Sequence, residues 1–551
     1  MLTFDNDAQK PFRQFHTWNT ISYAHALSSC VFEIANGVIA DGTGRKSRIN
    51  HGISIIGDRL RFSRSPNSRG KPVVIDAENL VIAPGFIDAH SHSDIAVLRN
   101  PKAENRLLQG ITTEVTGNCG FSPFPVTSLN RDNMKRDYLG AGVRLRWQSL
   151  GEYAAMVDSV RPAVNIAPLQ GHGNLRSAAM GYAGRPPTAK ELGAMKRLLS
   201  ESMRAGAFGF SSGLEYTPSS FADWMELAEL CSVVARYGGV YSTHMRNEDD
   251  MLRESVDESL KISSKSGARL EISHLKSTRS RNWGTVVSVL SELERKSRRN
   301  SAIGWDAYPY DASHTDLTIT LPKHVMDGGF GVMLQAVSSV EVRSKVKAEM
   351  MTGRNEEDWK AIVVEDIAAG DARRFNNMNL DDISKLMGVS PAEAVFRLLE
   401  ANGRDIPIIV HNMSEQDVDR VFSHPKTGIG SDSSIYTGGH PHPRAFGTFP
   451  RSFRKYVREL GTASLERMVR KASALTAERF SLGERGFIRD GYFADVVIFD
   501  PEKIQDHSTY ENPTAEPSGV KYVLVNGILE VENGRITGRR GGRVLRRGTA
   551  P

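Results

Sequence analysis

Cysteine is scarce in this chain of 551 residues, which contains only Cys30, Cys119 and Cys231. Three cysteines do not make a disulfide framework, and a low, odd number is typical of proteins from a reducing compartment. Long apolar runs are lacking too, since no stretch approaches the roughly 20 residues of a membrane-spanning helix. Residues 1–29 show neither the basic nor the apolar region of a signal peptide. We therefore expect a cytoplasmic protein without membrane partners, and an N-terminal arm, residues 1–29, of unassigned role.

Concentrated charge is also missing. The net charge is only +6, and the basic residues are scattered except in the tail. Nucleic-acid-binding proteins usually show a basic stripe with interleaved aromatic residues. Because no such stripe is present, we expect a small-molecule partner and no nucleic acid, while a homo-oligomer stays open. The tail arginines are Arg539, Arg540, Arg543, Arg546 and Arg547.

Two β-rich segments lie at opposite ends of the chain. Residues 30–83 contain short apolar runs separated by turn signals such as Asn36-Gly37. Residues 483–551 repeat this pattern around Asn526-Gly527. Asn-Gly between apolar runs is a strong hairpin signal. The pair of segments predicts one small β-sandwich assembled from both ends of the chain, with the basic tail attached to its second part.

The middle of the chain, residues 84–482, alternates short apolar runs with amphipathic segments. One helix is expected at 188–205, where Thr188 and Glu191 form a capping box, and another at 249–266. Eight strands alternating with helices predict an α/β fold of the (β/α)8 TIM-like barrel type. The expected strands are 80–87, 111–116, 163–169, 206–211, 239–243, 268–273, 302–307 and 427–430.

Two segments depart from this alternation. Residues 317–373 are polar and contain Gly328-Gly329, so we expect an insertion there, after barrel strand seven. The insertion is either a lid over the site or a surface excursion without function. Residues 407–414 are a ninth strand candidate, interpreted as an extra element before the last barrel strand.

Residues able to bind a metal follow five of the expected barrel strands. Functional groups of such barrels lie at the C-terminal ends of the strands, so these side chains should meet at one rim. His90 and His92 are two apart in an extended segment and face the same way. A lone strand-end histidine is usually structural, and a lone buried cysteine is usually a small hydrophobe. Chance is a poor explanation for six such residues at one rim: His90, His92, Cys119, His244, His274 and Asp432.

These residue types favour zinc and a proton carrier beside it. Imidazole and thiolate ligands together select zinc among the available divalent ions. Cys119 lies in a glycine-flanked turn that can present a ligand, whereas Cys231 lies in an apolar helix and is assigned to packing. Asp432 is the expected general base, because a carboxylate beside a metal ion can accept a proton from water and pass it to the leaving group. The alternative for Asp432 is a local turn or cap.

A series of motifs carries a resemblance that covers nearly the whole chain. In order they are PGFIDAHSHSD, GITTEVTGNCGFS, GHGNLR, GFSSGLEYTP, STHMRNE, ISHLKS, DAYPYDAS, GIGSDSS and GYFADVVIFDP. With these motifs the chain resembles the amidohydrolase superfamily and, within it, the N-acyl-D-amino-acid deacylases, or D-aminoacylases. The HxH element alone is common to the superfamily, whereas GNCG, ISHLKS and YPYDAS are much more specific.

The resemblance implies a metal centre of defined composition. Cys119, His244 and His274 would bind one zinc ion tightly. His90, His92 and Cys119 would form a second, weaker site for a divalent ion. Many members of the superfamily bridge two metals with a carboxylated lysine, and this chain offers Cys119 instead.

The resemblance also implies the catalytic and substrate-binding residues. Asp432 would be the catalytic acid and base. The carboxylate of an N-acyl-D-amino acid would be bound by cationic and hydroxyl groups. Each of these groups has a simpler interpretation as a rim charge or a packed tyrosine, and Arg444 is the least secure match. The residues are Tyr216, Lys276, Tyr308, Ser313 and Arg444.

The expected function is therefore zinc-dependent hydrolysis of N-acyl-D-amino acids. An alternative is a related amidohydrolase reaction on a cyclic amide, a dipeptide or another small amide or ester, because a similar site serves each of them. A non-catalytic scaffold on the same fold is a further alternative, but all the expected ligands and Asp432 are present. The preferred side chain and acyl group are left open.

Overall fold

The computed structural model describes residues 31–62, 72–140, 142–300, 302–368 and 370–548, so the expected arm at 1–29 lies outside the described residues. A sheet of eight parallel strands forms the centre of the molecule, in the order β18-β14-β13-β12-β11-β10-β9-β8. The Ala89 N–H closes this sheet into a barrel by donating to the Ile429 carbonyl at 2.9 Å. The strands are β8 (Phe86–Asp88), β9 (Ile111–Thr116), β10 (Asn165–Gly171), β11 (Gly209–Gly213), β12 (Val240–His244), β13 (Arg269–Ile272), β14 (Ile303–Ala307) and β18 (Thr427–Ile429).

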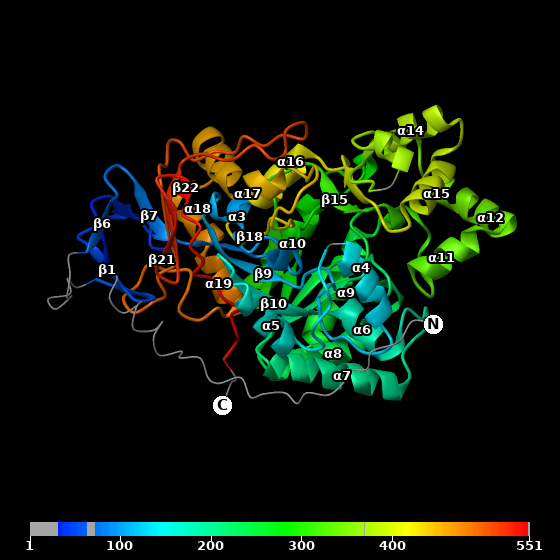
Figure 1. Ribbon diagram of the computed structural model, residues 1–551, viewed down its shortest axis with the longest axis horizontal. Coiled ribbons are helices and arrows are strands. Elements are labelled where there is room, and N and C mark those ends of the chain that lie inside the picture. Colours follow the sequence, from blue (N-terminus) through cyan, green and yellow to red (C-terminus); the bar gives the residue numbers. More distant parts are fainter. Residues whose placement is uncertain (1–30, 63–71, 141, 301, 369, 549–551) are drawn as a thin grey trace, which may run out of the picture.

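Helices between the strands cover the outside of the barrel (Figure 1). The helix expected at 188–205 is confirmed as α7 (Ala189–Arg204), with the capping box between Thr188 and Glu191 in place. The second expected helix, α9 (Leu252–Ser266), begins three residues late because Asn247 Oδ1 binds two preceding backbone N–H groups in a turn. Other covering helices are α5 (Leu150–Ser159), α6 (His172–Met180), α8 (Trp224–Arg236), α10 (Thr285–Arg299), α16 (Glu415–Ser423), α17 (Arg444–Phe453), α18 (Leu465–Ala472) and α19 (Ala474–Phe480).

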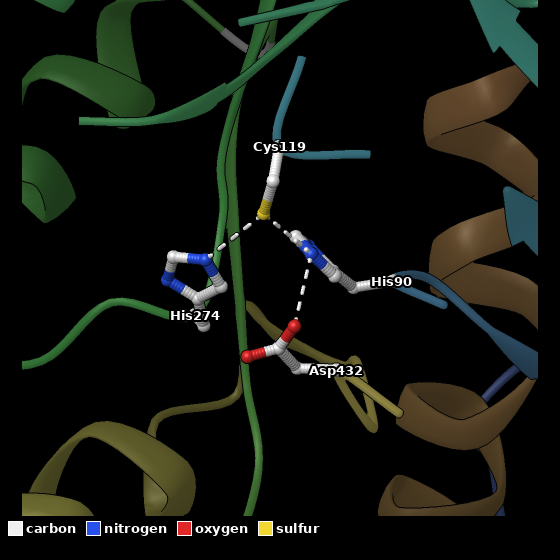
Figure 2. Close-up of side chains that lie close together, drawn as sticks. All are labelled: His90, Cys119, His274 and Asp432. Carbon is white, nitrogen blue, oxygen red and sulfur yellow. Dashed lines mark hydrogen bonds and ion pairs between the residues drawn. The ribbon is translucent and has the colours of Figure 1, made fainter. Parts of the chain in front are cut away.

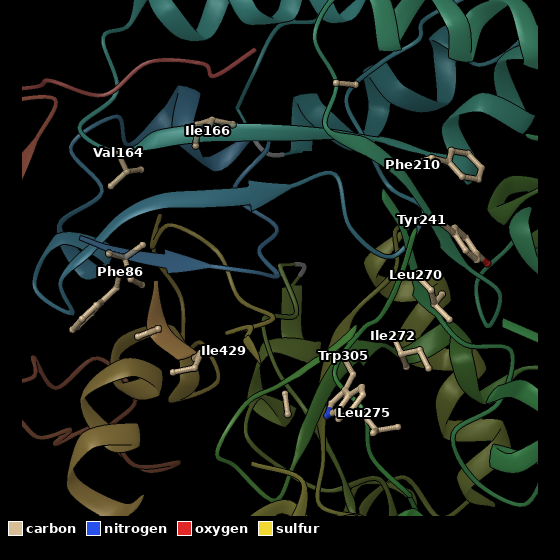
Figure 3. Packing of buried hydrophobic residues seen from close by; sticks show 14 of the residues in the cluster. Phe86, Val164, Ile166, Phe210, Tyr241, Leu270, Ile272, Leu275, Trp305 and Ile429 are labelled. Atoms are coloured by element: carbon tan, nitrogen blue, oxygen red, sulfur yellow. The ribbon is translucent and has the colours of Figure 1, made fainter. Parts of the chain in front are cut away.

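Apolar side chains from the barrel strands pack inside the fold and against these helices (Figure 3). Phe86 of β8 stacks on Phe449 of α17 with ring centroids 5.6 Å apart. Trp305 of β14 is fully buried and donates its Nε1–H to Thr427 of β18 at 2.8 Å. Burial of both faces explains why the barrel strands are near-continuous apolar runs in the sequence.

Two further sheets form the predicted β-sandwich, and both ends of the chain contribute. The first sheet has the order β5-β4-β1-β6, and the second the order β22-β21-β20-β19-β7-β2-β3. β7 (Val81–Pro84) pairs antiparallel with β19 (Val496–Phe499), so blue and red segments lie side by side in Figure 1. The other strands are β1 (Val31–Ala35), β2 (Val38–Ile39), β3 (Arg48–Ile49), β4 (Ile53–Ile56), β5 (Arg59–Arg61), β6 (Val73–Asp76), β20 (Val520–Val525), β21 (Ile528–Glu532) and β22 (Arg535–Ile536).

The basic tail is used inside the fold. Val544 forms a parallel bridge with Ile166, and the Leu545 N–H donates to the Ile166 carbonyl at 2.8 Å. Arg540 donates to the carbonyl of Val160 at 3.0 Å. These contacts attach the tail to the start of β10. Part of the tail's positive charge is therefore bound by groups of the protein itself.

The strand expected at 80–87 is two strands in two different sheets. β7 belongs to the sandwich and β8 to the barrel, and Gly85 separates them. A methyl group at Gly85 would collide with the side chain of Thr112 on β9. The apolar run is continuous because both strands are buried, so hydrophobicity alone does not mark the break between them.

The insertion after β14 is longer than residues 317–373. A three-stranded sheet, ordered β15-β17-β16, joins Ser313–Asp316, Pro407–Val410 and Ile362–Val364. The ninth strand candidate is thus part of the insertion, as β17. Its helices share an apolar cluster with the sheet, which explains why they resemble barrel helices in the sequence. They are α11 (Phe330–Val337), α12 (Val340–Met351), α13 (Glu356–Lys360), α14 (Leu380–Met387) and α15 (Pro391–Asn402).

The predicted (β/α)8 barrel, with a β-sandwich from both ends of the chain and an insertion after the seventh barrel strand, is confirmed. Across the residues described, no helix is both long enough and apolar enough to cross a membrane.

We predict that Gly85→Ala lowers the free energy of unfolding by about 1–3 kcal/mol, because the added methyl group overpacks the junction of β7 and β8. Gly193→Ala in α7 is the control, since its methyl group would meet nothing closer than the Arg197 guanidinium at 3.9 Å. Alanine there should stabilise the protein by about 0.5–1 kcal/mol. Urea unfolding of both variants measures the effect, and a stabilising Gly85→Ala would contradict the packing argument.

Candidate active site

A cluster of histidines surrounds Cys119 at the C-terminal rim of the barrel (Figure 2). The Cys119 Sγ atom lies 3.2 Å from His90 Nε2, 3.5 Å from His274 Nε2 and 3.7 Å from His244 Nδ1. The four residues come from the ends of β8, β9, β12 and β13. A ring nitrogen of each of the three histidines points at the Cys119 sulfur, so these strand-end residues meet as the sequence predicted.

Asp432, which follows β18, completes the cluster. Its Oδ1 atom lies 3.4 Å from His90 Nε2 and 3.1 Å from His92 Nε2. Its Oδ2 atom lies 3.0 Å from a terminal nitrogen of Arg444. All six residues singled out at strand ends are thus brought to one place, with the carboxylate between two histidines and an arginine.

The cluster is buried, and its acidic groups are nevertheless held in their charged forms. Burial alone would raise the pKa of the Cys119 thiol, but the neighbouring histidines, with His90 foremost, hold it well below its usual range. Burial likewise opposes ionisation of Asp432, yet the charges of Arg444 and His274 hold its pKa well below normal. A thiolate and a carboxylate in this position are ligand types that a divalent cation requires.

Three residues of the cluster have backbone angles that side chains rarely adopt. The φ angles are 51° at Cys119, 33° at His274 and 50° at Asp432. Positive φ is uncommon for residues other than glycine and costs roughly 1–3 kcal/mol where the structure imposes it. At each strand end this conformation turns the chain so that the side chain faces the centre of the rim.

Two glutamates bind the outer nitrogens of the histidines. His244 directs Nδ1 at Cys119, and its Nε2 lies 2.9 Å from Glu215. His274 directs Nε2 at Cys119, and its Nδ1 lies 3.0 Å from Glu248. Glu248 also pairs with Lys276 at 2.6 Å, and Lys276 Nζ hydrogen-bonds to the same His274 Nδ1 atom at 2.8 Å. Such partners fix the ring orientation of metal-binding histidines.

Glu215, Glu248 and Asp306 were not assigned a role from the sequence, although each lies within a motif quoted above. Asp306 on β14 accepts a hydrogen bond from the His274 N–H at 2.9 Å, and its carboxylate lies 3.8 Å from His90 Nδ1. The only hint in the sequence was that GLEYTP, STHMRNE and DAYPYDAS each contain a carboxylate. This hint was insufficient, because these carboxylates meet the histidines across neighbouring strands, and the spacing of residues along the sequence does not reveal such contacts.

A buried ionic network ties β8 to β18, the strands that carry half of the cluster. Asp88 accepts hydrogen bonds from the backbone N–H groups of Ser431 at 2.8 Å and His90 at 3.2 Å. Arg106 lies 3.7 Å from Asp88 and 3.0 Å from Glu114, and all three side chains are fully buried. The network holds the end of β8 against the end of β18.

Among the residues that the structure describes, two groups of side chains fit a metal ion. Within each group the possible ligand atoms lie within 4.8 Å of one another. Imidazole nitrogen, thiolate sulfur and carboxylate oxygen are the ligands that zinc takes in proteins. The donor set therefore fits zinc. The first group is His90, Cys119, His274 and Asp432, and the second is His244, Glu248 and His274.

The cluster opens into a cavity of about 460 Å³. Cys119 and Asp432 line this cavity, and so do apolar side chains of the inserted sheet, including Ile362, Ile408 and Val410. The insertion therefore lies against the catalytic rim and forms part of the same cavity, which is where a lid would lie.

Four of the five expected substrate-binding residues line this cavity: Tyr216, Lys276, Ser313 and Arg444. Lys276 and Arg444 are 5% and 1% exposed, so both cations are held in a buried wall. Tyr308 lies behind that wall, with its ring 4.6 Å from the Arg444 guanidinium and 6.0 Å from the Lys276 ammonium group. Its expected role in binding substrate stays a prediction.

Similarity to known proteins extends over nearly the whole chain. A model of the amidohydrolase family matches residues 73–308 and 314–529. The chain belongs to this family. The amidohydrolase is 35% identical to an N-acyl-D-aspartate deacylase and 33% identical to a D-aminoacylase, both from Alcaligenes xylosoxydans xylosoxydans. Each match covers 94% of this chain, with 95% of the first relative and 98% of the second.

The fold of this amidohydrolase also matches a solved structure over nearly its full length. The crystal structure is an N-acyl-D-glutamate deacylase from Bordetella bronchiseptica, complexed with zinc and a phosphonate inhibitor that mimics the tetrahedral intermediate. The TM-score is 0.78 at 32% identity, covering 94% of this chain and 99% of the other. The family predicted from the sequence motifs is confirmed.

We predict that Asp88→Ala lowers the free energy of unfolding by about 3 kcal/mol or more, because it removes one partner of a buried charge and leaves Arg106 undercompensated. Asp132→Ala is the control, since that side chain is 92% exposed. A surface change of this kind should alter stability by no more than about 0.5 kcal/mol. Denaturant unfolding of the two variants measures this difference. Equal losses of unfolding free energy would contradict the role given to the buried network.

Proposed function

We propose that this amidohydrolase is a zinc-dependent deacylase that hydrolyses N-acyl-D-amino acids to a D-amino acid and a carboxylate. One observation carries the proposal: the Cys119 cluster shares a cavity with two buried cations, Lys276 and Arg444. A substrate with an amide bond and a nearby carboxylate matches both features. The relatives are a D-aminoacylase and deacylases of N-acyl-D-aspartate and N-acyl-D-glutamate, which supports this substrate class and its configuration.

Cys119, His244 and His274 would hold one zinc ion tightly. His90 and His92 would hold a second, weaker divalent ion together with Cys119. Zinc, when bound, supplies a Lewis acid that polarises a carbonyl group and makes a nearby water molecule more acidic. Glu215 would keep the His244 ring oriented, and Lys276 together with Glu248 would keep the His274 ring oriented, because these groups contact the ring nitrogens that face away from Cys119.

Asp432 would carry the proton. Its carboxylate lies beside His90 and His92 and is held in the ionised form by Arg444, so it can accept a proton from the attacking water. It would then donate this proton to the amide nitrogen of the collapsing tetrahedral intermediate. This second step is necessary because an amine leaves far more readily than an amide anion.

Arg444, Lys276 and Ser313 would bind the carboxylate of the amino acid, with Tyr216 and Tyr308 beside them. Arg444 suits this role because its Nε–H, although buried, has no hydrogen-bond partner in the described part of the chain. Charge-assisted bonds from arginine to carboxylate are among the strong hydrogen bonds in proteins. A cyclic amide, or a simple amide without a carboxylate, would leave this donor unused.

A reducing, cytoplasmic location is part of the proposal. Cys119 and Cys231 are both free thiols, and the proposed ligand role of Cys119 depends on a reduced sulfur.

Paired N-acetyl-D- and N-acetyl-L-amino acids, with apolar and acidic side chains, test the function. We expect hydrolysis of the D series only, in protein that contains about one tightly bound zinc ion per chain. The carboxamide analogue of the best substrate should be a poor substrate, because it lacks the charge that Arg444 and Lys276 would bind. Comparable rates for D and L forms, or full activity in metal-free protein, would refute the proposal.

Cys119 and Cys231 give a test of the metal centre. Cys119→Ala should lose both bound zinc and activity, because the central thiolate is gone. Cys231→Ala removes a sulfur that is fully buried in α8, and should keep zinc and activity while losing about 1 kcal/mol of stability. Metal analysis and kinetics on the same samples separate the two roles. Similar behaviour of the two variants would contradict this division.

Asp432→Asn tests the proton carrier. The amide keeps the shape of the side chain but cannot accept a proton, so kcat should fall by about 10²–10⁴-fold while zinc is retained. Substrate binding should change far less. Near-normal turnover, or loss of zinc in proportion to activity, would show that Asp432 is not the proton carrier.

A further inference from the structure

A second cavity, of about 610 Å³, adjoins the cavity that contains Cys119. Phe121, Glu215, Tyr216, Asp316 and Ile319 line both cavities. The two spaces are therefore separated by a single layer of side chains. The proposed reaction has so far used only the first cavity.

Beyond this layer the wall of the second cavity is mixed: it has one group of apolar side chains, and it also carries polar and charged ones, among them Lys323, Arg404 and Asp405. Tyr182, Leu321, Met326 and Phe330 contribute to its wall. The carboxylate of Asp405 also borders it, but it is already engaged by the backbone N–H groups of Thr318 at 3.1 Å and Ile406 at 2.9 Å. An apolar ligand group would bury its surface here against Leu321, Met326 and Phe330.

Two aromatic rings form the partition nearest to the metal-binding cluster. Phe121 follows Cys119 by two residues, is 43% exposed, and lies with its ring centroid 5.5 Å from that of Tyr216. The Tyr216 ring in turn lies 4.8 Å from the ring of His244. The Tyr216 hydroxyl is anchored 3.0 Å from Thr315 Oγ1 on the inserted sheet. Tyr216 is therefore fixed at both ends, and Phe121 is the more exposed half of the partition.

The direction of a bound substrate follows from the charges. The amide bond must lie at the Cys119 cluster, and the amino-acid carboxylate is drawn to Lys276 and Arg444. The acyl group is attached to the other side of the amide carbon, so it points away from these cations. Phe121 follows Cys119 by two residues and lines both cavities, so it offers the acyl group an apolar surface beside the amide bond.

We infer that the second cavity receives the acyl chain of the substrate, so that the enzyme prefers N-acyl-D-amino acids whose acyl group is several carbons longer than acetyl. The inference rests on the proposed function, since it deepens the choice of substrate at the same site. The acyl chain passes between Phe121 and Ile319 and packs against Leu321, Met326 and Phe330.

The first measurement compares N-acetyl and N-hexanoyl derivatives of one D-amino acid. Each methylene group transferred from water to an apolar site is worth about fourfold in kcat/KM. The hexanoyl chain has four more methylenes than acetyl, so even partial burial should raise kcat/KM by at least about tenfold. A hexanoyl substrate no better than the acetyl one overturns the inference.

Three variants locate the effect. Ile319→Trp fills the passage and should bring the hexanoyl-to-acetyl ratio of kcat/KM close to one. Phe121→Ala opens the partition and should raise that ratio. Because the Phe121 ring is half-exposed, its truncation is less disruptive to folding than the insertion of a tryptophan. Val332→Trp is the matched control, because Val332 on α11 is 49% exposed and lines neither cavity. A ratio that responds equally to Ile319→Trp and Val332→Trp contradicts the inference.

The outcomes separate the inference from the function on which it rests. If no N-acyl-D-amino acid is hydrolysed, whatever its acyl length, the proposed function fails. If N-acetyl substrates are hydrolysed with no gain from longer acyl chains, only the inference fails. The amino-acid side chain is the competing occupant. A series of N-acetyl-D-amino acids with lengthening side chains therefore completes the test, and selective loss of the longer members in Ile319→Trp would assign the second cavity to the side chain instead.

Discussion

The closure of the barrel between β8 and β18 is the constraint on which the whole site depends. The Asp432 N–H donates to the His90 carbonyl at 2.8 Å, and the His92 N–H to the Ser433 carbonyl at 2.8 Å. Beneath these bonds, the buried Asp88 carboxylate holds the backbone of both strands. The histidines of one strand and the carboxylate of the other are thereby positioned by backbone geometry. Their separation is set before any metal or substrate binds.

Charge balance is the second requirement, because burial opposes every charged group in the site. Burial would raise the pKa of Glu248, but Lys276 and His244 lower it to about 2. Asp432 is compensated in the same way by Arg444. Buried charges are tolerated only when such partners are present. The cations proposed to bind substrate therefore also keep the acidic groups ionised, so the site couples recognition of the carboxylate to the protonation state of its own residues.

The sequence was sufficient for the barrel, the six strand-end residues and the family, because these depend on alternation and on motifs that are local in the chain. It was insufficient for features that depend on neighbouring strands. Glu215 and Glu248 pair with histidines across the rim, and no spacing in the sequence indicates those contacts. The break at Gly85 was hidden because a strand of each sheet is buried on either side of it. The insertion was cut short at 373 because its later helices are amphipathic like those of the barrel.

The β-sandwich has a consequence for how the protein is made. Ala83 pairs with Val497, so β7, which has β2 on one side, acquires its second neighbour only when nearly all of the chain has been synthesised. At typical rates of translation this delay is on the order of tens of seconds. During that time one edge of β7, the strand that carries Ile82, is unpaired, and strand edges of this kind are prone to aggregate. Efficient production of the enzyme in a cell should therefore depend on chaperones that bind the nascent N-terminal strands until the last ones emerge from the ribosome.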